Sequence, residues 1–153
     1  VCAMSIEKDI QQSKFRNEYQ KTVVNIIYTY NWVTEKTKQI FERGDITSQQ
    51  YNILRILRGA GKPLSTLQIR QRMLDKMSDT SRIVDRLVKK DLVQKVICKT
   101  DRRLVDVTIT EQGMALLDKL DGYNDEMDAL LGNITEDEAK MLNQLLDKIR
   151  SSE

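Results

Sequence analysis

The stretch Ser78–Thr110, SDTSRIVDRLVKKDLVQKVICKTDRRLVDVTIT, decides how the chain folds. Its first half is expected to form a helix that Ser78 caps and that ends near Asp91. The residue spacing separates an apolar face from a basic face, as in an amphipathic helix. The apolar face holds Ile83, Val84, Leu87 and Val88, and the opposite face holds Arg82, Arg86, Lys89 and Lys90.

The second half of this stretch predicts a β-hairpin. Residues 93–99 and 104–109 are rich in residues that favour strands, and the second segment alternates between apolar and polar positions. The turn between them, Lys99-Thr100-Asp101-Arg102-Arg103, carries three cations. We therefore expect a helix followed by a hairpin with a basic tip.

Another short helix is expected just upstream, from Ser65 to about Leu74, with a turn at residues 75–77. Two short helices joined by three or four residues are typical of a helix-turn-helix. A hairpin that directly follows such a motif is the wing of a winged helix.

Longer helices are expected on both sides of this unit. Residues 5–43 indicate one long helix, or two with a bend, that Gly44 ends as a C-cap. Residues 47–58, 111–132 and 136–151 indicate three more. Capping boxes are expected for Thr47 with Gln50, Ser65 with Gln68, and Thr135 with Glu138.

These elements predict a mainly α (α+β) fold, a winged helix-turn-helix with long N- and C-terminal dimerisation helices. The last two helices have apolar faces that need partners, and the first helix and a second subunit would supply them. We divide one intertwined unit into an N-terminal dimerisation and linker helix (1–44), a winged helix-turn-helix lobe (45–110) and C-terminal dimerisation helices (111–153).

Charge is distributed unevenly along the chain. Residues 1–77 hold 13 Lys/Arg and 7 Asp/Glu, and residues 78–103 hold 8 and 4. Residues 104–153 hold 4 Lys/Arg and 12 Asp/Glu. A basic front and an acidic tail suggest a polyanionic partner on one side of the molecule.

Composition argues against an enzyme. The chain has no histidine, the commonest general base and metal ligand, and it has no Gly-rich phosphate loop or nucleophile elbow. We expect no cofactor and no metal. The distant Cys2 and Cys98, without a CxxC, suggest a reducing cytoplasmic setting. No apolar run long enough to span a membrane and no signal peptide is evident, and Met4 is expected to be the natural start after an artificial Val1–Ala3.

The basic stretch supports DNA binding as the first hypothesis. Short polar groups in the first turn of a recognition helix can meet base edges and phosphates, and a cationic wing can meet phosphates or the minor groove. Arg103 is expected in a minor groove, with Arg102 and Lys99 on phosphates, while Asp101 holds one of the arginines by a charge-assisted hydrogen bond. The expected DNA-binding residues are Ser78, Thr80, Ser81, Arg82, Arg86, Lys99, Asp101, Arg102 and Arg103.

Three further hypotheses stay open. The same surface could bind an acidic protein. Cys98, beside Lys99, could be a redox-sensitive thiol of lowered pKa, or a small buried strand residue. A pocket for a small ligand could lie where aromatic and basic residues mix, although each of these positions also suits core or surface packing. The pocket candidates are Tyr28, Trp32, Tyr51, Arg55 and Arg58.

Several motifs resemble the MarR family of bacterial transcription regulators. The resemblance covers about residues 10–150, and Asp91 departs from it, because a Gly is frequent there. The matching residues are Ile46-Thr47, Gln50-Tyr51 and Leu54, then Arg86-Leu87, Leu92-Val93, Asp101-Arg102-Arg103 and Ile109-Thr110-Glu111-Gln112-Gly113.

The resemblance implies a triangular homodimer whose first, fifth and sixth helices form the base. Two recognition helices would read successive major grooves of a pseudopalindromic operator, and two wings would reach the flanking minor grooves. Repression is the commonest role in the family. Many members release DNA when a small aromatic or anionic effector binds, and others respond to thiol oxidation.

Overall fold

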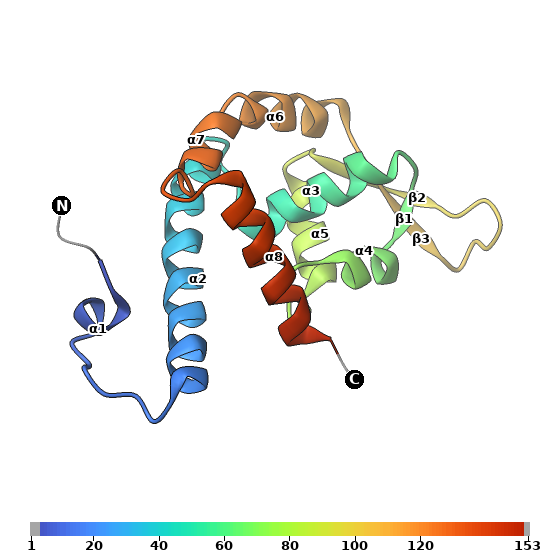
Figure 1. Cartoon of the computed structure of the whole chain (residues 1–153). Helices are drawn as coiled ribbons and strands as arrows, with labels where there is room; N and C mark the ends of the chain where they lie inside the picture. The colour runs from blue at the N-terminus through green and yellow to red at the C-terminus, as the bar shows by residue number, and fades with distance from the viewer. Residues whose placement is uncertain (1–3, 152–153) are drawn as a thin grey trace.

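The computed structural model describes residues 4–151, so Cys2 and the expected extension Val1–Ala3 lie outside the described residues. No helix within residues 4–151 combines the length and apolarity needed to cross a bilayer. In chain order the elements are α1 (Ile6–Asp9), α2 (Glu18–Glu42), α3 (Ser48–Ala60), β1 (Leu64–Ser65), α4 (Thr66–Arg72), α5 (Thr80–Lys89), β2 (Val93–Ile97), β3 (Val105–Ile109), α6 (Glu111–Asp121), α7 (Asn124–Ala129) and α8 (Glu136–Arg150) (Figure 1).

The winged-helix lobe expected from the sequence is confirmed. Helices α3, α4 and α5 pack with one another and with a small antiparallel sheet. The amphipathic pattern of α5 places Val84 and Leu87 in the core, where both are fully buried. Burial of such aliphatic side chains is the main force that holds the lobe together. Other fully buried residues are Ile53, Leu54, Leu64, Ile69, Val107 and Leu117.

The sheet has the strand order β1–β3–β2. Strands β2 and β3 form the expected hairpin, in a register that places Val93 opposite Ile109. Strand β1 is an addition to the predicted fold. It pairs Leu64 with Val107, and both side chains are fully buried, so β1 fastens the hairpin to the start of α4.

Local capping signals predicted the starts of α3, α4 and α8 correctly. The three capping boxes of Thr47, Ser65 and Thr135 are all confirmed. Thr110 caps α6 by accepting a hydrogen bond from the Gly113 N–H at 3.1 Å. Each cap satisfies a backbone amide that the helix itself leaves unpaired.

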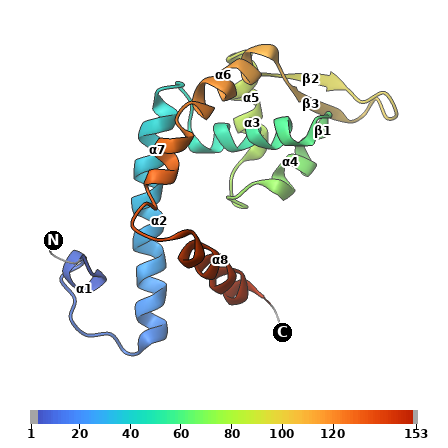
Figure 2. The same ribbon diagram turned by 45° about the horizontal axis from the view of Figure 1, so that its top comes forward.

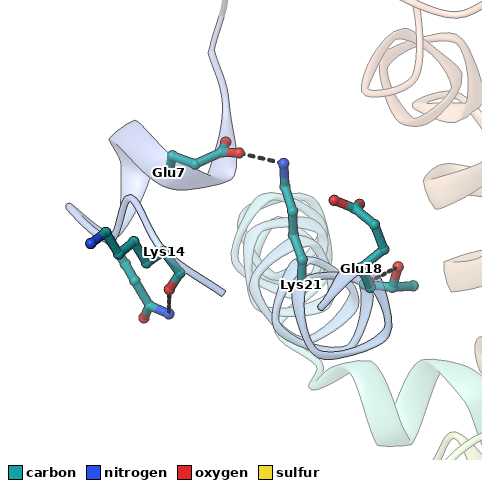
Figure 3. A network of polar contacts seen from close by, with 6 residues as sticks. Glu7, Lys14, Glu18 and Lys21 are labelled. Carbon is teal, nitrogen blue, oxygen red and sulfur yellow. Dashed lines mark hydrogen bonds and ion pairs between the residues drawn. The ribbon is translucent and has the colours of Figure 1, made fainter. Parts of the chain in front are cut away.

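The prediction of helix throughout residues 5–43 is wrong in its first part. Residues 10–17 are mostly irregular and separate α1 from α2, which Asn17 caps. These residues are mainly polar and offer no apolar stripe that a helix could bury. Lys21 of α2 forms an ion pair with Glu7, and Figure 3 shows the two side chains pointing toward each other. The N-terminal arm therefore lies beside α2 instead of extending it (Figure 1).

The expected helix over residues 111–132 is also interrupted. Gly122 and Tyr123 form a turn between α6 and α7. The guanidinium of Arg43 lies 4.7 Å from the Tyr123 ring centre and forms a 2.6 Å ion pair with Glu126. These contacts fasten the end of α2 to the turn and to α7, which favours a change of direction over a continuous helix.

Helix α8 stands apart from the lobe. Figure 2 shows it projecting away from both α2 and α5. None of its residues is buried, although Leu142, Leu145 and Ile149 recur at helical spacing. An amphipathic helix with an uncovered apolar face lacks the packing that normally stabilises such a helix.

Two aspartates take left-handed backbone conformations just after helices. Asp45 (φ 53°) follows α2, so the prediction that Gly44 is the C-cap is wrong. Asp91 (φ 56°) follows α5, where the Leu92 N–H donates to the Leu87 carbonyl at 3.1 Å. This is the bond of a Schellman ending, which glycine adopts with less strain than other residues. The helix thus ends as it would with a glycine at this position.

Replacing Asp91 with Gly is expected to raise the free energy of unfolding by about 0.5 kcal/mol, because relief of the left-handed strain outweighs the added entropy of the unfolded chain. Urea titration measures this change. Asp91→Ala is the control, since it removes the same charge but keeps the Cβ atom, and we expect it not to stabilise. A less stable Asp91→Gly protein would contradict the described helix ending.

Candidate nucleic-acid interface

The corner between α4 and α5 is organised by Asp75. One oxygen of its carboxylate accepts a hydrogen bond from the Met77 N–H at 2.9 Å, and the other accepts from the Gln49 side-chain amide at 3.1 Å. The Ser78 hydroxyl donates to the Asp75 carbonyl at 2.8 Å. These bonds connect the corner to α3 and so fix the direction in which α5 leaves it.

The first turn of α5 differs from its predicted form. Asp79, not Ser78, is the N-cap, and it accepts a hydrogen bond from the Arg82 N–H at 3.2 Å. Ser78 is half-buried and Ser81 is exposed. Thr80 is only 3% exposed, and its hydroxyl oxygen has no hydrogen-bond partner among residues 4–151. Of the three hydroxyls, that of Ser81 is the most accessible to a large ligand.

The outer face of α5 carries exposed cations. Arg82 and Arg86 lie one turn apart, and the Arg82 side chain is 73% exposed although its Nε lies 3.7 Å from Asp79. Lys95 of β2 forms a 2.6 Å ion pair with Asp85, and this hydrogen bond lowers the pKa of the Asp85 carboxyl. Because Lys95 neutralises Asp85, the positive charge of the two arginines dominates the face.

The wing tip is the loop between β2 and β3, residues 98–104. The Cys98 N–H donates to the Leu104 carbonyl at 3.0 Å, which closes the turn. Asp101 accepts from the backbone N–H of Arg103 at 2.9 Å. The Asp101 carboxylate thus binds the backbone and not, as the sequence predicts, an arginine side chain, and its role is to shape the turn.

Three cations of the wing tip are free to meet a ligand. Lys99, Arg102 and Arg103 are exposed, and none of them forms an ion pair within the described part of the chain. Figure 1 shows the hairpin extending beyond the rest of the lobe. Unpaired cations on a projecting element are suited to a polyanion.

Cys98 follows the end of β2 and is half-buried, not fully buried as its packing interpretation assumed. Its sulfur lies 3.1 Å from the Thr100 hydroxyl oxygen, and this hydrogen bond is the main reason that the pKa of the thiol lies below its ordinary value. Backbone amides of Asp101 and Thr100 add to the effect. Lys99, the residue expected to lower this pKa, is not among the causes.

The pocket candidates fall into two groups. Tyr51, Arg55 and Arg58 lie together on α3, and the Arg55 guanidinium is 5.9 Å from the Tyr51 ring centre. Arg58 forms a 2.7 Å ion pair with Asp121 of α6, so its charge is already matched. Tyr28 and Trp32 are exposed on α2, and no described contact joins them to the first group.

A groove that sequence reasoning missed lies at the start of α5. It has a volume of about 470 Å³ and separates the outer side of α4 from the first turn of α5. Leu67, Arg70 and Met77 line it together with Ser81. No group of histidine, cysteine or carboxylate side chains within residues 4–151 is arranged to hold a metal ion.

Comparison with known proteins shows which family these features resemble. The model of the MarR family matches residues 44–104, from the end of α2 to the wing tip. A curated relative is the HTH-type transcriptional regulator MhqR of Bacillus subtilis, 24% identical over 131 residues that span 84% of this chain and 89% of the relative.

Solved structures share the fold over most of the chain. A mutant of MarR from E. coli in complex with operator DNA matches with a TM-score of 0.81 and 24% identity, over 91% of this chain and all of that one. BpsR of Bordetella bronchiseptica, described with the regulation of its DNA binding by 6-hydroxynicotinic acid, matches with a TM-score of 0.79 and 20% identity, over 92% of this chain and all of that one.

Proposed function

The chain belongs to the MarR family of transcription regulators, and we propose that it binds a pseudopalindromic DNA operator as a homodimer. One observation carries the proposal: the wing projects three cations that form no ion pair among the described residues, beside the exposed Arg82 and Arg86 of α5. Helix α5 would enter the major groove, and the wing would follow the phosphates to the adjacent minor groove.

The roles of the individual residues follow from their positions. Arg82 and Arg86, on the outer face of α5, would meet base edges or phosphates, and Ser81 would add a hydroxyl at the start of the helix. Lys99 and Arg102 would bind phosphates, and Arg103 would enter the minor groove. Three of the predicted residues would act indirectly, because they shape the elements that carry the others. They are Ser78, Thr80 and Asp101.

The dimer would form through the uncovered apolar faces. Helix α2 exposes Tyr19, Val23, Ile27 and Tyr30, and α8 exposes its own apolar stripe. Apolar surface of this extent marks an interaction site in a globular protein. A second copy of the chain would cover it, since the two recognition helices of a two-fold dimer can then meet successive turns of B-DNA, about 34 Å apart.

We further propose repression with release by a small aromatic or anionic effector, in the cytoplasm. The support is the common behaviour of the family and the example of BpsR, whose DNA binding is regulated by 6-hydroxynicotinic acid. Tyr51 and Arg55 are the best placed of the pocket candidates, because they lie side by side on α3. Arg58 is less accessible to an anion because Asp121 already binds it.

Arg103→Ala is expected to weaken operator binding by about 1–3 kcal/mol and to lower the salt slope by about one unit, because one cation leaves the interface. Selection of bound genomic fragments first identifies the operator, and titrations at several salt concentrations then measure affinity. Arg16→Ala, an exposed arginine in the loop before α2, is the matched control and should bind as the wild type. Unchanged affinity of Arg103→Ala would remove the wing from the interface.

A second candidate function is binding of an acidic protein through the same cationic surface. Both functions depend on salt, so salt alone does not separate them. Competition with unrelated DNA separates the two functions. If the protein binds a defined palindrome tightly and unrelated DNA does not displace it, the regulator is supported. Binding that shows no sequence preference, together with capture of an acidic protein, would favour the second function. A redox response through Cys98 is tested by peroxide treatment of Cys98→Ser.

A further inference from the structure

The groove at the start of α5 has an apolar wall that the cationic surface does not explain. Leu67 of α4 is 63% exposed and Met77 of the corner is 92% exposed, and both line the groove. A single exposed apolar residue needs no explanation. Here two exposed apolar residues share one groove, and the groove lies beside the helix that is proposed to read DNA. This arrangement suits a ligand with apolar groups.

The exposure of Leu67 and Met77 does not arise because the core lacks room for side chains from this segment. Ile69 and Met73, close by in the same segment, fill the core and are 0% and 2% exposed. The backbone of Met77 is fixed, because its N–H donates to the Asp75 carboxylate at 2.9 Å. The helix-turn-helix therefore holds an apolar side chain outward at a defined place.

The charges around the groove indicate which ligand fits. Arg70 lines the groove together with Leu67 and Met77, and Arg82 lies in the first turn of α5. Asp79 also lines the groove, and Asp75 belongs to the same corner, but each accepts a hydrogen bond from a backbone amide of the corner or of α5. Apolar groups flanked by exposed arginines match the DNA major groove, where phosphates border base edges and the thymine methyl is the apolar feature.

We propose that Leu67 and Met77 read the 5-methyl groups of thymines in the operator and so help to determine its sequence. This inference rests on the proposed function and adds the base preference of the same surface. Methionine suits this role because its flexible, polarisable side chain adapts to a small apolar target. The two arginines would bind the bordering phosphates and keep the groove against the bases.

The test removes single methyl groups from the DNA. Thymines of the selected operator are replaced one at a time by deoxyuridine, which keeps base pairing and lacks only the methyl. At one or two positions per half-site, wild-type affinity should fall about fourfold, the value of one buried methyl group. With Met77→Ala or Leu67→Ala, the thymine and deoxyuridine operators should bind equally at the position that each residue reads.

Leu74→Ala is the matched control. Leu74 belongs to the same corner and is 88% exposed, but it does not line the groove. It should keep the wild-type dependence on the methyl group. All three side chains are exposed, so the variants should fold, and equal thermal midpoints verify this.

Two results would overturn the inference and leave the proposed function intact. One is an operator that binds tightly with no methyl dependence at any position. The other is a methyl dependence that survives in both Met77→Ala and Leu67→Ala. If no specific operator emerges from the selection, the proposed function fails and the inference fails with it.

Discussion

Replacing Gly113 with alanine is expected to lower the free energy of unfolding by about 3 kcal/mol. A Cβ atom at this position would lie 2.3 Å from the Leu92 carbonyl oxygen and 2.7 Å from Cγ1 of Ile109. The first contact is with backbone, so no change of rotamer relieves it. Either α6 or the end of α5 would have to move.

The backbone around Gly113 explains why the fit is so close. The Thr110 N–H donates to the Leu92 carbonyl at 3.1 Å, and the Thr110 hydroxyl donates to the Asp91 carbonyl at 2.6 Å. The same hydroxyl accepts from the Gly113 N–H at 3.1 Å. One threonine thus joins the end of α5, the end of β3 and the start of α6. A shift of α6 would break these bonds together.

Urea unfolding of Gly113→Ala measures the loss of stability. Gly59→Ala is the matched control, because no atom lies within 4 Å of the Cβ that it would add. Gly59 is also inside α3, where alanine favours the helix by up to about 1 kcal/mol. We therefore expect opposite signs for the same chemical change. A Gly113→Ala protein as stable as the wild type would contradict the described packing of α6.

The features predicted correctly from the sequence depend on neighbouring residues. A capping box joins residues three positions apart, so Thr47, Ser65 and Thr135 revealed their helix starts directly. The hairpin was also predictable, because residues that favour strands lie on both sides of a polar turn and the second segment alternates between apolar and polar positions. The amphipathic period of α5 likewise placed its buried and exposed faces correctly.

The features that were missed depend on contacts between distant residues. Strand β1 has two residues, and only its pairing with β3 makes it a strand. The break between α6 and α7 lies where Arg43, the C-cap of α2, meets Tyr123. Neither contact can be recognised from the residues that surround it in the sequence. A glycine at position 122 was visible, but an isolated glycine does not by itself end a helix.

The candidate site shows the same division. Composition located the cations of α5 and the wing, because charge is a property of single residues. The N-cap was assigned one residue too early, since Ser78 and Asp79 are both good caps and the corner around Asp75 decides between them. Burial of Thr80 and the apolar groove beside it arise from the angle between α4 and α5, which the sequence does not state.

Leu145→Asp is expected to convert the proposed dimer into monomers and to weaken operator binding by about 100-fold or more. Leu145 is 53% exposed in the middle of the apolar stripe of α8, between Leu142 and Ile149. In a dimer this position would be buried, and an unpaired carboxylate there costs several kcal/mol. A monomer engages one half-site only and loses the gain in effective concentration that a second linked half-site provides.

The matched control adds the same charge to α8 outside its apolar stripe. Asn143→Asp lies two positions away, about 200° around the helix, and should remain dimeric. Light scattering after gel filtration measures the oligomeric state, and fluorescence titration of the selected operator measures affinity. If Leu145→Asp stays dimeric and binds as the wild type, α8 does not form the interface. The exposed apolar residues of α2 would then have to carry the dimer without it.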